Sequence, residues 1–143
     1  MVHEALVIET YGTVRPVDLP SDPEGRSSAL RVVVGGFAES ARYHPRALLY
    51  VNADGAEVPN VAAWALACAW RGLDLDYSLY GPVVVTAASP GDPLPEDLVG
   101  QVHAAAEGVV EVLAEWRSRR PVSSEAGIRE LLAQVRFRVP AGV

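Results

Sequence analysis

The stretch that decides the fold runs Asn60-Val-Ala-Ala-Trp-Ala-Leu-Ala-Cys-Ala-Trp-Arg-Gly72. Ten apolar residues follow one another from 61 to 70 without a charged side chain. A helix that is apolar on every side is stable only when most of its sides are buried. Asn60 is a favoured N-cap residue, and Arg71 followed by Gly72 is typical of a helix end. The sequence therefore predicts that residues 61–70 form the central core helix of the domain.

Short apolar segments on both sides of this helix predict the strands of a sheet. Each segment is bounded by residues that favour turns, such as Tyr11-Gly12-Thr13, His44-Pro45-Arg46 and Asp54-Gly55. The expected strands cover residues 5–9, 13–18, 37–43, 47–52 and 81–86.

Three further helices are expected from capping residues and from apolar side chains at helical spacing. They cover residues 23–34, residues 95–116 and a segment from Ser123 or Ser124 to Val135. At the C-terminal, negatively polarised end of the helix over residues 95–116 we expect Arg117, Arg119 and Arg120. Residues 136–139 are expected either to extend as an edge strand or to fray.

Together these elements predict an α+β fold, in which a small antiparallel or mixed sheet of about five strands packs against the buried helix and a long C-terminal helix. A length of 143 residues favours a single domain that needs no metal or disulfide to bury a core. Within it we expect an α+β core over residues 1–100 and a helical C-terminal extension, residues 101–143, packed on the same domain.

The charges are unevenly distributed along the chain. The net charge is −6, which argues against general nucleic-acid binding. Residues 73–116 contain eight carboxylates and no arginine, whereas residues 117–143 contain six arginines and two glutamates. Either these are solvated helix faces, or the basic end pairs with the acidic stretch or with a partner. Because no signal peptide opens the chain and no apolar run is long enough to span a bilayer, we expect a cytoplasmic protein with no membrane partner.

The order of several short motifs resembles that of an uncharacterised bacterial and phage family, domain of unknown function 3846. The motifs are Val34-Gly-Gly-Phe37, Leu49-Tyr-Val-Asn52 with Asp54-Gly55, Pro59-Asn60 with Ala63, and Gly81-Pro-Val-Val-Val85. The resemblance covers roughly residues 4 to 100. The chain departs from the family at Ser27-Ser-Ala-Leu-Arg31, where members carry a leucine-rich helix, and at Val61, where they often carry proline. Members are frequent in phages, plasmids and other mobile elements, so the resemblance implies that context and no particular reaction.

Four residues are candidates for binding a small ligand. Asn60 is a natural cap of the core helix, which alone explains its position. Because it also matches the family's characteristic asparagine, a ligand-facing amide is the alternative. Asp74 and Asp76 share one face of an extended segment if Leu73 and Leu75 point inward. Paired carboxylates can bind a divalent ion or transfer protons, although acidic residues in a connecting segment are ordinary. Tyr80 completes this polar and aromatic cluster.

The long helix is the candidate protein interface. Val99, Ala106 and Val110 lie beside its main apolar stripe, and Trp116 stands at its end. This apolar surface exceeds what one small domain is expected to cover, and tryptophan often anchors interfaces. A homodimer through this helix is therefore one hypothesis.

The sequence contains no recognisable catalytic, metal-binding or cofactor-binding signature. Cys68 is the only cysteine and lies in an apolar run, so we expect a buried, unreactive thiol. The histidines His3, His44 and His103 lack the paired spacing of a zinc site. Neither a phosphate-binding loop nor a nucleophile elbow occurs.

Two functions remain open from the sequence. The first, which the missing chemistry favours, is a non-enzymatic accessory or regulatory protein that acts by binding another protein, in keeping with a phage or mobile-element context. The alternative is a small-molecule or nucleotide-binding protein, with or without enzymatic activity. A pocket lined by Asn60, Asp74 or Tyr80 would favour the second, and an apolar patch on the long helix would favour the first.

Overall fold

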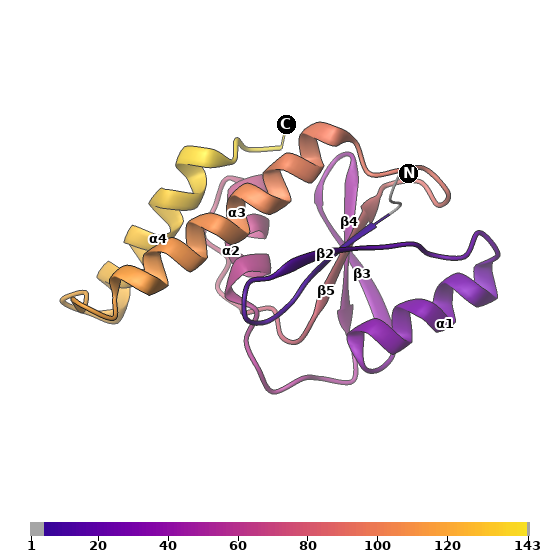
Figure 1. Ribbon diagram of the computed structural model, residues 1–143, viewed down its shortest axis with the longest axis horizontal. Coiled ribbons are helices and arrows are strands. Elements are labelled where there is room, and N and C mark those ends of the chain that lie inside the picture. Colours follow the sequence, from indigo (N-terminus) through magenta and orange to yellow (C-terminus); the bar gives the residue numbers. More distant parts are fainter. Residues whose placement is uncertain (1–4, 143) are drawn as a thin grey trace.

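A five-stranded antiparallel sheet forms the centre of the molecule in the computed structural model, which describes residues 5–142 (Figure 1). The strand order is β2-β1-β5-β4-β3, so the last strand of the chain lies in the middle of the sheet. The strands are β1 (Ala5–Ile8), β2 (Val14–Val17), β3 (Ala38–His44), β4 (Ala47–Asn52) and β5 (Val83–Ala87). The expected α+β fold with a sheet of about five strands is confirmed.

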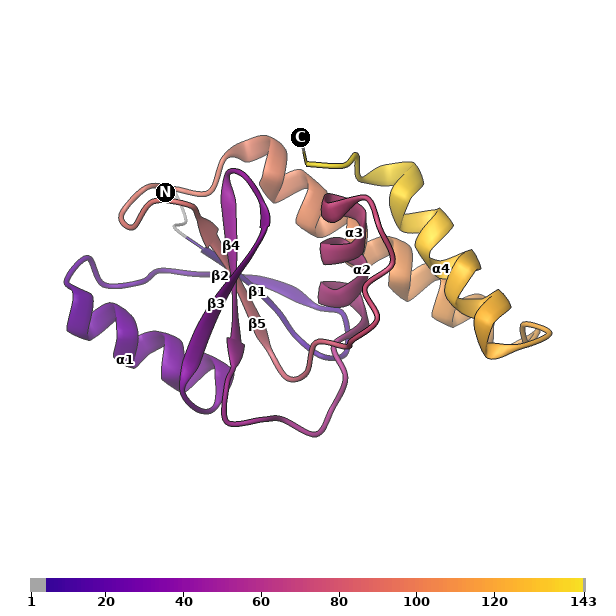
Figure 2. The same ribbon diagram turned by 180° about the vertical axis from the view of Figure 1, so that it is seen from behind.

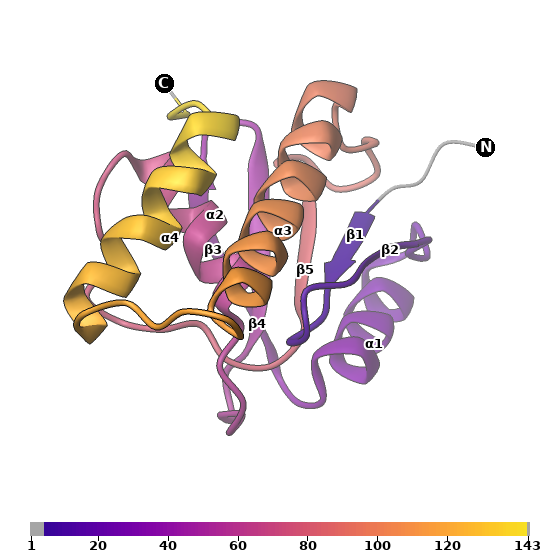
Figure 3. The ribbon, with the colours of Figure 1, turned by 60° about the vertical axis from the view of Figure 1, so that its left-hand side comes forward.

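Helices cover both faces of this sheet. Helix α1 (Pro23–Val34) lies on one face, while α2 (Val61–Arg71), α3 (Glu96–Glu115) and α4 (Ser124–Arg138) lie on the other (Figures 1 and 3). The side chains of the central strands alternate between these two layers, as strand geometry requires. Leu6 pairs with Val85 and faces α2 and α3, whereas Val7 pairs with Val84 and faces α1.

Helix α2 is the core helix that the sequence predicts. It packs between the sheet and the two C-terminal helices (Figure 2), and eight of its eleven residues are buried. Asn60 caps its first turn through a hydrogen bond from the Ala63 N–H, and Gly72 ends it in the left-handed conformation. The thiol of Cys68 is buried within this helix.

Two boundaries near the C-terminus differ from the prediction. Helix α3 ends at Glu115, so Arg117, Arg119 and Arg120 lie in the turn that follows it and not in its last turn. The edge strand considered for residues 136–139 is wrong, because α4 continues to Arg138. Val135 and Val139 are both buried four residues apart, so the apolar stripe of the helix extends past the expected end.

The C-terminal helices pack into the same hydrophobic core as the strands. Leu131, Leu132 and Val135 belong to the same buried cluster as Leu49 and Val85. The boundary expected at residue 100 lies inside the continuous helix α3.

His3 lies outside the described residues. Within residues 5–142, none of the helices combines the length and the apolar character needed to cross a membrane.

Candidate functional site

Asn60, the first predicted ligand residue, is buried and fully engaged inside the protein. Its side-chain amide donates to the carbonyl oxygens of Ile8 at 2.9 Å and Gly81 at 2.8 Å. Its carbonyl oxygen accepts from the Ala63 N–H at 3.0 Å. Because both amide hydrogens and the oxygen are occupied, Asn60 ties β1 and the start of β5 to α2 and does not face a ligand.

The other three predicted ligand residues are exposed. Asp74 forms an ion pair with Arg136 of α4 at 2.7 Å. Tyr80 forms an isolated bridge with Pro59, next to Asn60 in the chain. Asp76 has an exposed side chain. Within residues 5–142 no hydrogen bond joins any two of these four side chains, so the structure does not assemble them into one site.

The four predicted interface residues of α3 separate into core and surface. Ala106 is only 3% exposed and belongs to the core of the chain, so its placement on a free face of the helix is corrected. Val99 is half-buried against the same core. Val110 is 46% exposed beside Gly12, and Trp116 is half-buried at the end of the helix. The buried arc of α3 is wide because α2, α4 and β2 all contact it.

An apolar groove opens at the end of α3 that carries Trp116. It has a volume of about 290 Å³ and is formed by α2, by the loop before β5, and by the α3–α4 hairpin. We call it the tryptophan groove; its lining residues are Val61, Trp64, Ser78, Leu113, Trp116, Ile128 and Leu131. The α3–α4 hairpin projects beyond the sheet (Figure 1), so this end of the helices has fewer neighbours to cover it.

A second hollow adjoins the tryptophan groove at the α3–α4 turn. The two share Trp116 and Ile128, and the second adds Arg120, Pro121 and Ser124 among its lining residues. Leu113 is 41% exposed and Ile128 is 46% exposed along this surface. Two large aliphatic side chains therefore flank a half-buried tryptophan at the surface of the domain.

The indole nitrogens of Trp64 and Trp116 are the unusual polar atoms of the groove. Both are buried, and neither forms a well-aligned hydrogen bond among the described residues, although the Trp116 N–H lies near the Glu130 carboxyl. The Trp116 N–H lies near enough to Glu130 to contribute to lowering the pKa of that carboxyl, after the larger effect of Arg119. A buried donor without a partner costs about 1–3 kcal/mol. Because both nitrogens are shielded from solvent, a molecule in the groove would contact the rings and not these N–H groups.

The arginines around the α3–α4 hairpin fall into two groups. Arg119 bridges Glu115 and Glu130, Arg136 pairs with Asp74, and Arg138 pairs with Glu111. The expected pairing of the basic end with the acidic stretch therefore occurs for these three. By contrast, Arg117 and Arg120 are exposed beside Trp116 and have no carboxylate partner in the described part of the chain.

The sequence indicates most of the groove residues as apolar but does not indicate that they are exposed. Leu113 and Ile128 occupy positions on the apolar stripes of their helices, which predicts burial. Only the helix lengths could have indicated this exposure. Helix α3 has 20 residues and α2, on which it packs, has 11, so part of α3 extends beyond α2.

Comparisons with protein-family models, with curated proteins and with solved structures found no match. Among residues 5–142, no group of three or more histidine, cysteine, aspartate or glutamate side chains is arranged to hold a metal ion.

Proposed function

We propose that this protein is a non-enzymatic interaction module that binds an acidic amphipathic helix of a partner protein in the tryptophan groove. The observation that carries the proposal is the apolar groove itself, in which Leu113 and Ile128, 41% and 46% exposed, flank two half-buried tryptophans. Tryptophan is enriched among the residues that dominate binding energy at interfaces.

The size of the groove suits side chains of a partner better than a whole metabolite. Small-molecule sites usually enclose about 300–1,000 Å³, and this groove, at about 290 Å³, lies at the lower limit. A cavity of about 150 Å³ holds one benzene ring, so the groove accommodates about two large apolar side chains. An amphipathic helix presents such side chains three or four residues apart.

Charge determines which helix fits. Arg120 lines the hollow that adjoins the groove at the α3–α4 turn, and Arg117 follows Trp116 in the chain; neither has a carboxylate partner among the described residues. Acidic residues in the partner helix at that end would complement them and increase the rate of association. The binding partner therefore combines apolar anchors with acidic residues at one end.

The cellular setting is part of the same proposal. An accessory or regulatory role in the cytoplasm fits a protein that binds without catalysing a reaction. A phage or mobile-element context, in which the partner would be encoded nearby, is what the resemblance of residues 4–100 to domain of unknown function 3846 would imply.

Selection from a displayed library of helical peptides tests the proposal. The wild-type protein should enrich peptides with apolar residues at i, i+3 or i+4 and i+7, and with acidic residues near one end. Ile128→Glu should abolish their binding, since it places a carboxylate in the groove. Val32→Glu is the matched control, because Val32 is 83% exposed on α1 and should tolerate the same change.

Several results would contradict the proposal. The proposal is wrong if the selection yields no peptide whose binding is lost in Ile128→Glu. It is also wrong if the enriched peptides carry basic residues at their ends. A concentration-dependent dimer of the protein that Ile128→Glu disrupts would assign the groove to a second copy of the chain instead.

A further inference from the structure

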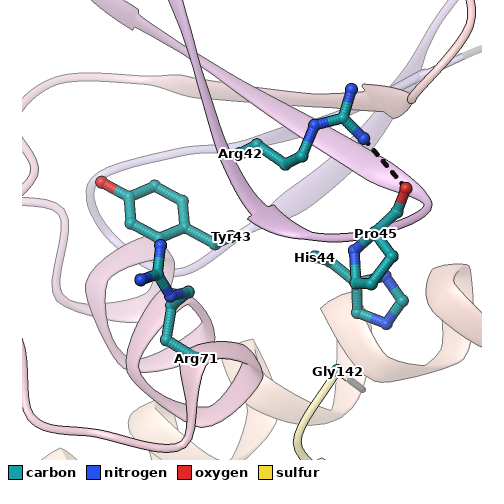
Figure 4. Close-up of a pocket in the computed structure, with 6 residues that line it drawn as sticks. All are labelled: Arg42, Tyr43, His44, Pro45, Arg71 and Gly142. Carbon is teal, nitrogen blue, oxygen red and sulfur yellow. Dashed lines mark hydrogen bonds between the residues drawn. The ribbon is translucent and has the colours of Figure 1, made fainter.

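A second hollow lies at the edge of the sheet, where β3 meets the end of α2. Its volume is about 450 Å³, and we call it the arginine hollow. It is lined by Arg42, Tyr43, His44, Pro45, Arg71 and Gly142. Figure 4 shows Arg42 extending from β3 with its guanidinium turned toward the Pro45 carbonyl, and Arg71 rising from the end of α2 beside the Tyr43 ring.

An irregularity in the sheet shapes the hollow. The pairing of β3 with β4 shifts register between Ala41 and His44. Side chains of a regular strand alternate between the two faces, yet Tyr43 and His44 are consecutive and both buried. A bulge of this kind redirects side chains at the edge of a sheet. Arg42 is left exposed next to the two buried rings.

The two arginines carry positive charge that no carboxylate in the described chain neutralises. Arg42 donates only to the carbonyl oxygen of Pro45, at 2.9 Å, and Arg71 makes no ion pair within residues 5–142. Two of the nearby acids, Asp97 and Asp74, are already engaged, whereas Asp76 is exposed one residue before Tyr77, whose hydroxyl hydrogen-bonds Tyr43. Asp97 binds Arg46 with two hydrogen bonds, at 2.5 and 3.1 Å, and Asp74 binds Arg136. In a chain with a net charge of −6, this is a local excess of positive charge.

The polar groups beside the arginines, which are His44 and the last carbonyl oxygens of α2, would not repel a bound anion. His44 Nδ1 accepts the Arg46 backbone N–H at 3.0 Å, so the proton of the neutral imidazole lies on Nε2, which is a donor. The last carbonyl oxygens of α2 are also occupied. Cys68 and Ala69 accept from the Gly72 N–H, and Trp70 accepts from the Gly142 N–H at 2.8 Å.

We propose that the arginine hollow binds the phosphate group of a small organic phosphate. Guanidinium groups bind phosphate through two parallel hydrogen bonds, and Arg42 and Arg71 both line this hollow. A phosphate dianion carries twice the charge of a single carboxylate, so it gains more from two positive side chains. The hollow is open to solvent, so the organic part of the molecule can extend outward from the phosphate. This site is separate from the tryptophan groove and shares no lining residue with it.

The test is a titration of the ¹⁵N-labelled full chain, followed by NMR, with pyrophosphate, AMP, succinate and a phosphoserine peptide. Pyrophosphate and AMP should shift the amide signals of residues 42–46 and 71–72 and saturate in the millimolar range or below. Succinate should bind at least about tenfold more weakly. Arg42→Gln and Arg71→Gln should each weaken AMP binding about tenfold, because each removes a charge-assisted contact.

Arg31→Gln provides the matched control, since Arg31 is exposed on α1 and has no ion pair within the described residues. It should leave binding unchanged. The proposal is overturned if the wild-type spectrum shows no saturable change at residues 42–46, if succinate binds as well as AMP, or if the Arg31 variant loses as much affinity as the others. Tighter binding of the phosphoserine peptide than of AMP would also overturn it, by assigning the hollow to a phosphoprotein.

Discussion

The side-chain amide of Asn60 donates to the backbone carbonyl of Ile8 at 2.9 Å, and so joins the start of the core helix to the end of a central strand. The same amide also donates to the Gly81 carbonyl, and the Asn60 side-chain oxygen accepts from the Ala63 N–H. A residue that the sequence offers both as a cap and as a ligand-facing amide is therefore a buried structural link.

Replacing Asn60 by alanine should destabilise the fold strongly. The change leaves two buried carbonyls and one N–H without partners, at about 1–3 kcal/mol each, so we expect a total loss of about 3 kcal/mol or more. Urea denaturation measures the free energy of unfolding. Ser123→Ala, which removes the more exposed cap of α4, should cost only about 1 kcal/mol. Equal losses for the two variants would show that Asn60 acts as a simple cap.

The stability of the protein should fall as the pH is lowered below about 6.5. Burial, followed by the nearby charge of Arg46, lowers the pKa of His44, while Asp97 opposes this shift. The unfolded chain then binds a proton more readily than the folded chain, so the contribution is complete above the ordinary histidine pKa and is lost as the pH falls through the lowered value. The ring also packs against Trp70, with centroids 5.0 Å apart.

Thermal unfolding from pH 7.5 to 5 measures this dependence. His44→Gln should flatten the decline in this range, because glutamine cannot take up the proton. A decline that is unchanged in the variant would show that another group is responsible.

The two faces of α4 should respond differently to truncation. Leu132 is buried, so Leu132→Ala should cost about 2–5 kcal/mol in unfolding free energy. Ile128 is half exposed, and Ile128→Ala should cost about 1 kcal/mol or less. Chemical denaturation of the two variants provides the comparison. A large loss for Ile128→Ala would mean that this side chain belongs to the core and is not available to a partner.

Cys68 should resist thiol reagents while the protein is folded. The thiol is buried, and burial raises its pKa, although the Leu75 N–H that it accepts at 3.4 Å acts in the opposite direction. Since the thiolate is the reactive form, labelling by iodoacetamide should be slow until urea unfolds the chain. An engineered Ser124→Cys, on the exposed first turn of α4, should react at once under the same conditions. Rapid labelling of native Cys68 would require that α2 opens locally.

Local signals in the sequence account for the elements of the fold. The apolar run before Gly72, the cap at Asn60 and the turn residues around Pro45 each act over a few residues, and the structure has a helix or a strand end at each of them. The order of the strands depends on pairing between distant segments, such as Leu6 with Val85, which no local pattern encodes. The same holds for the position of α1 alone on one face of the sheet.

The candidate sites were less predictable, because exposure depends on neighbours. Trp116 follows from the sequence as an interface residue, but Leu113 and Ile128 carry the same apolar signal as buried residues of the same helices. Arg42 and Arg71 are 29 positions apart, and only the packing of α2 against the bulged strand brings them to one hollow. Helical spacing alone also could not show that Ala106 is covered by neighbouring elements.

The most direct test of the proposed function follows the three indole N–H signals in ¹⁵N–¹H NMR spectra during titration with an acidic amphipathic peptide from the display selection. Trp64 and Trp116 should shift, because their rings line the groove and gain a new neighbour when it is filled. Trp70 should stay in place, since its indole N–H already donates to Gln101 at 2.8 Å. Unchanged signals for Trp64 and Trp116 at saturating peptide would contradict the assignment of the groove as the partner site.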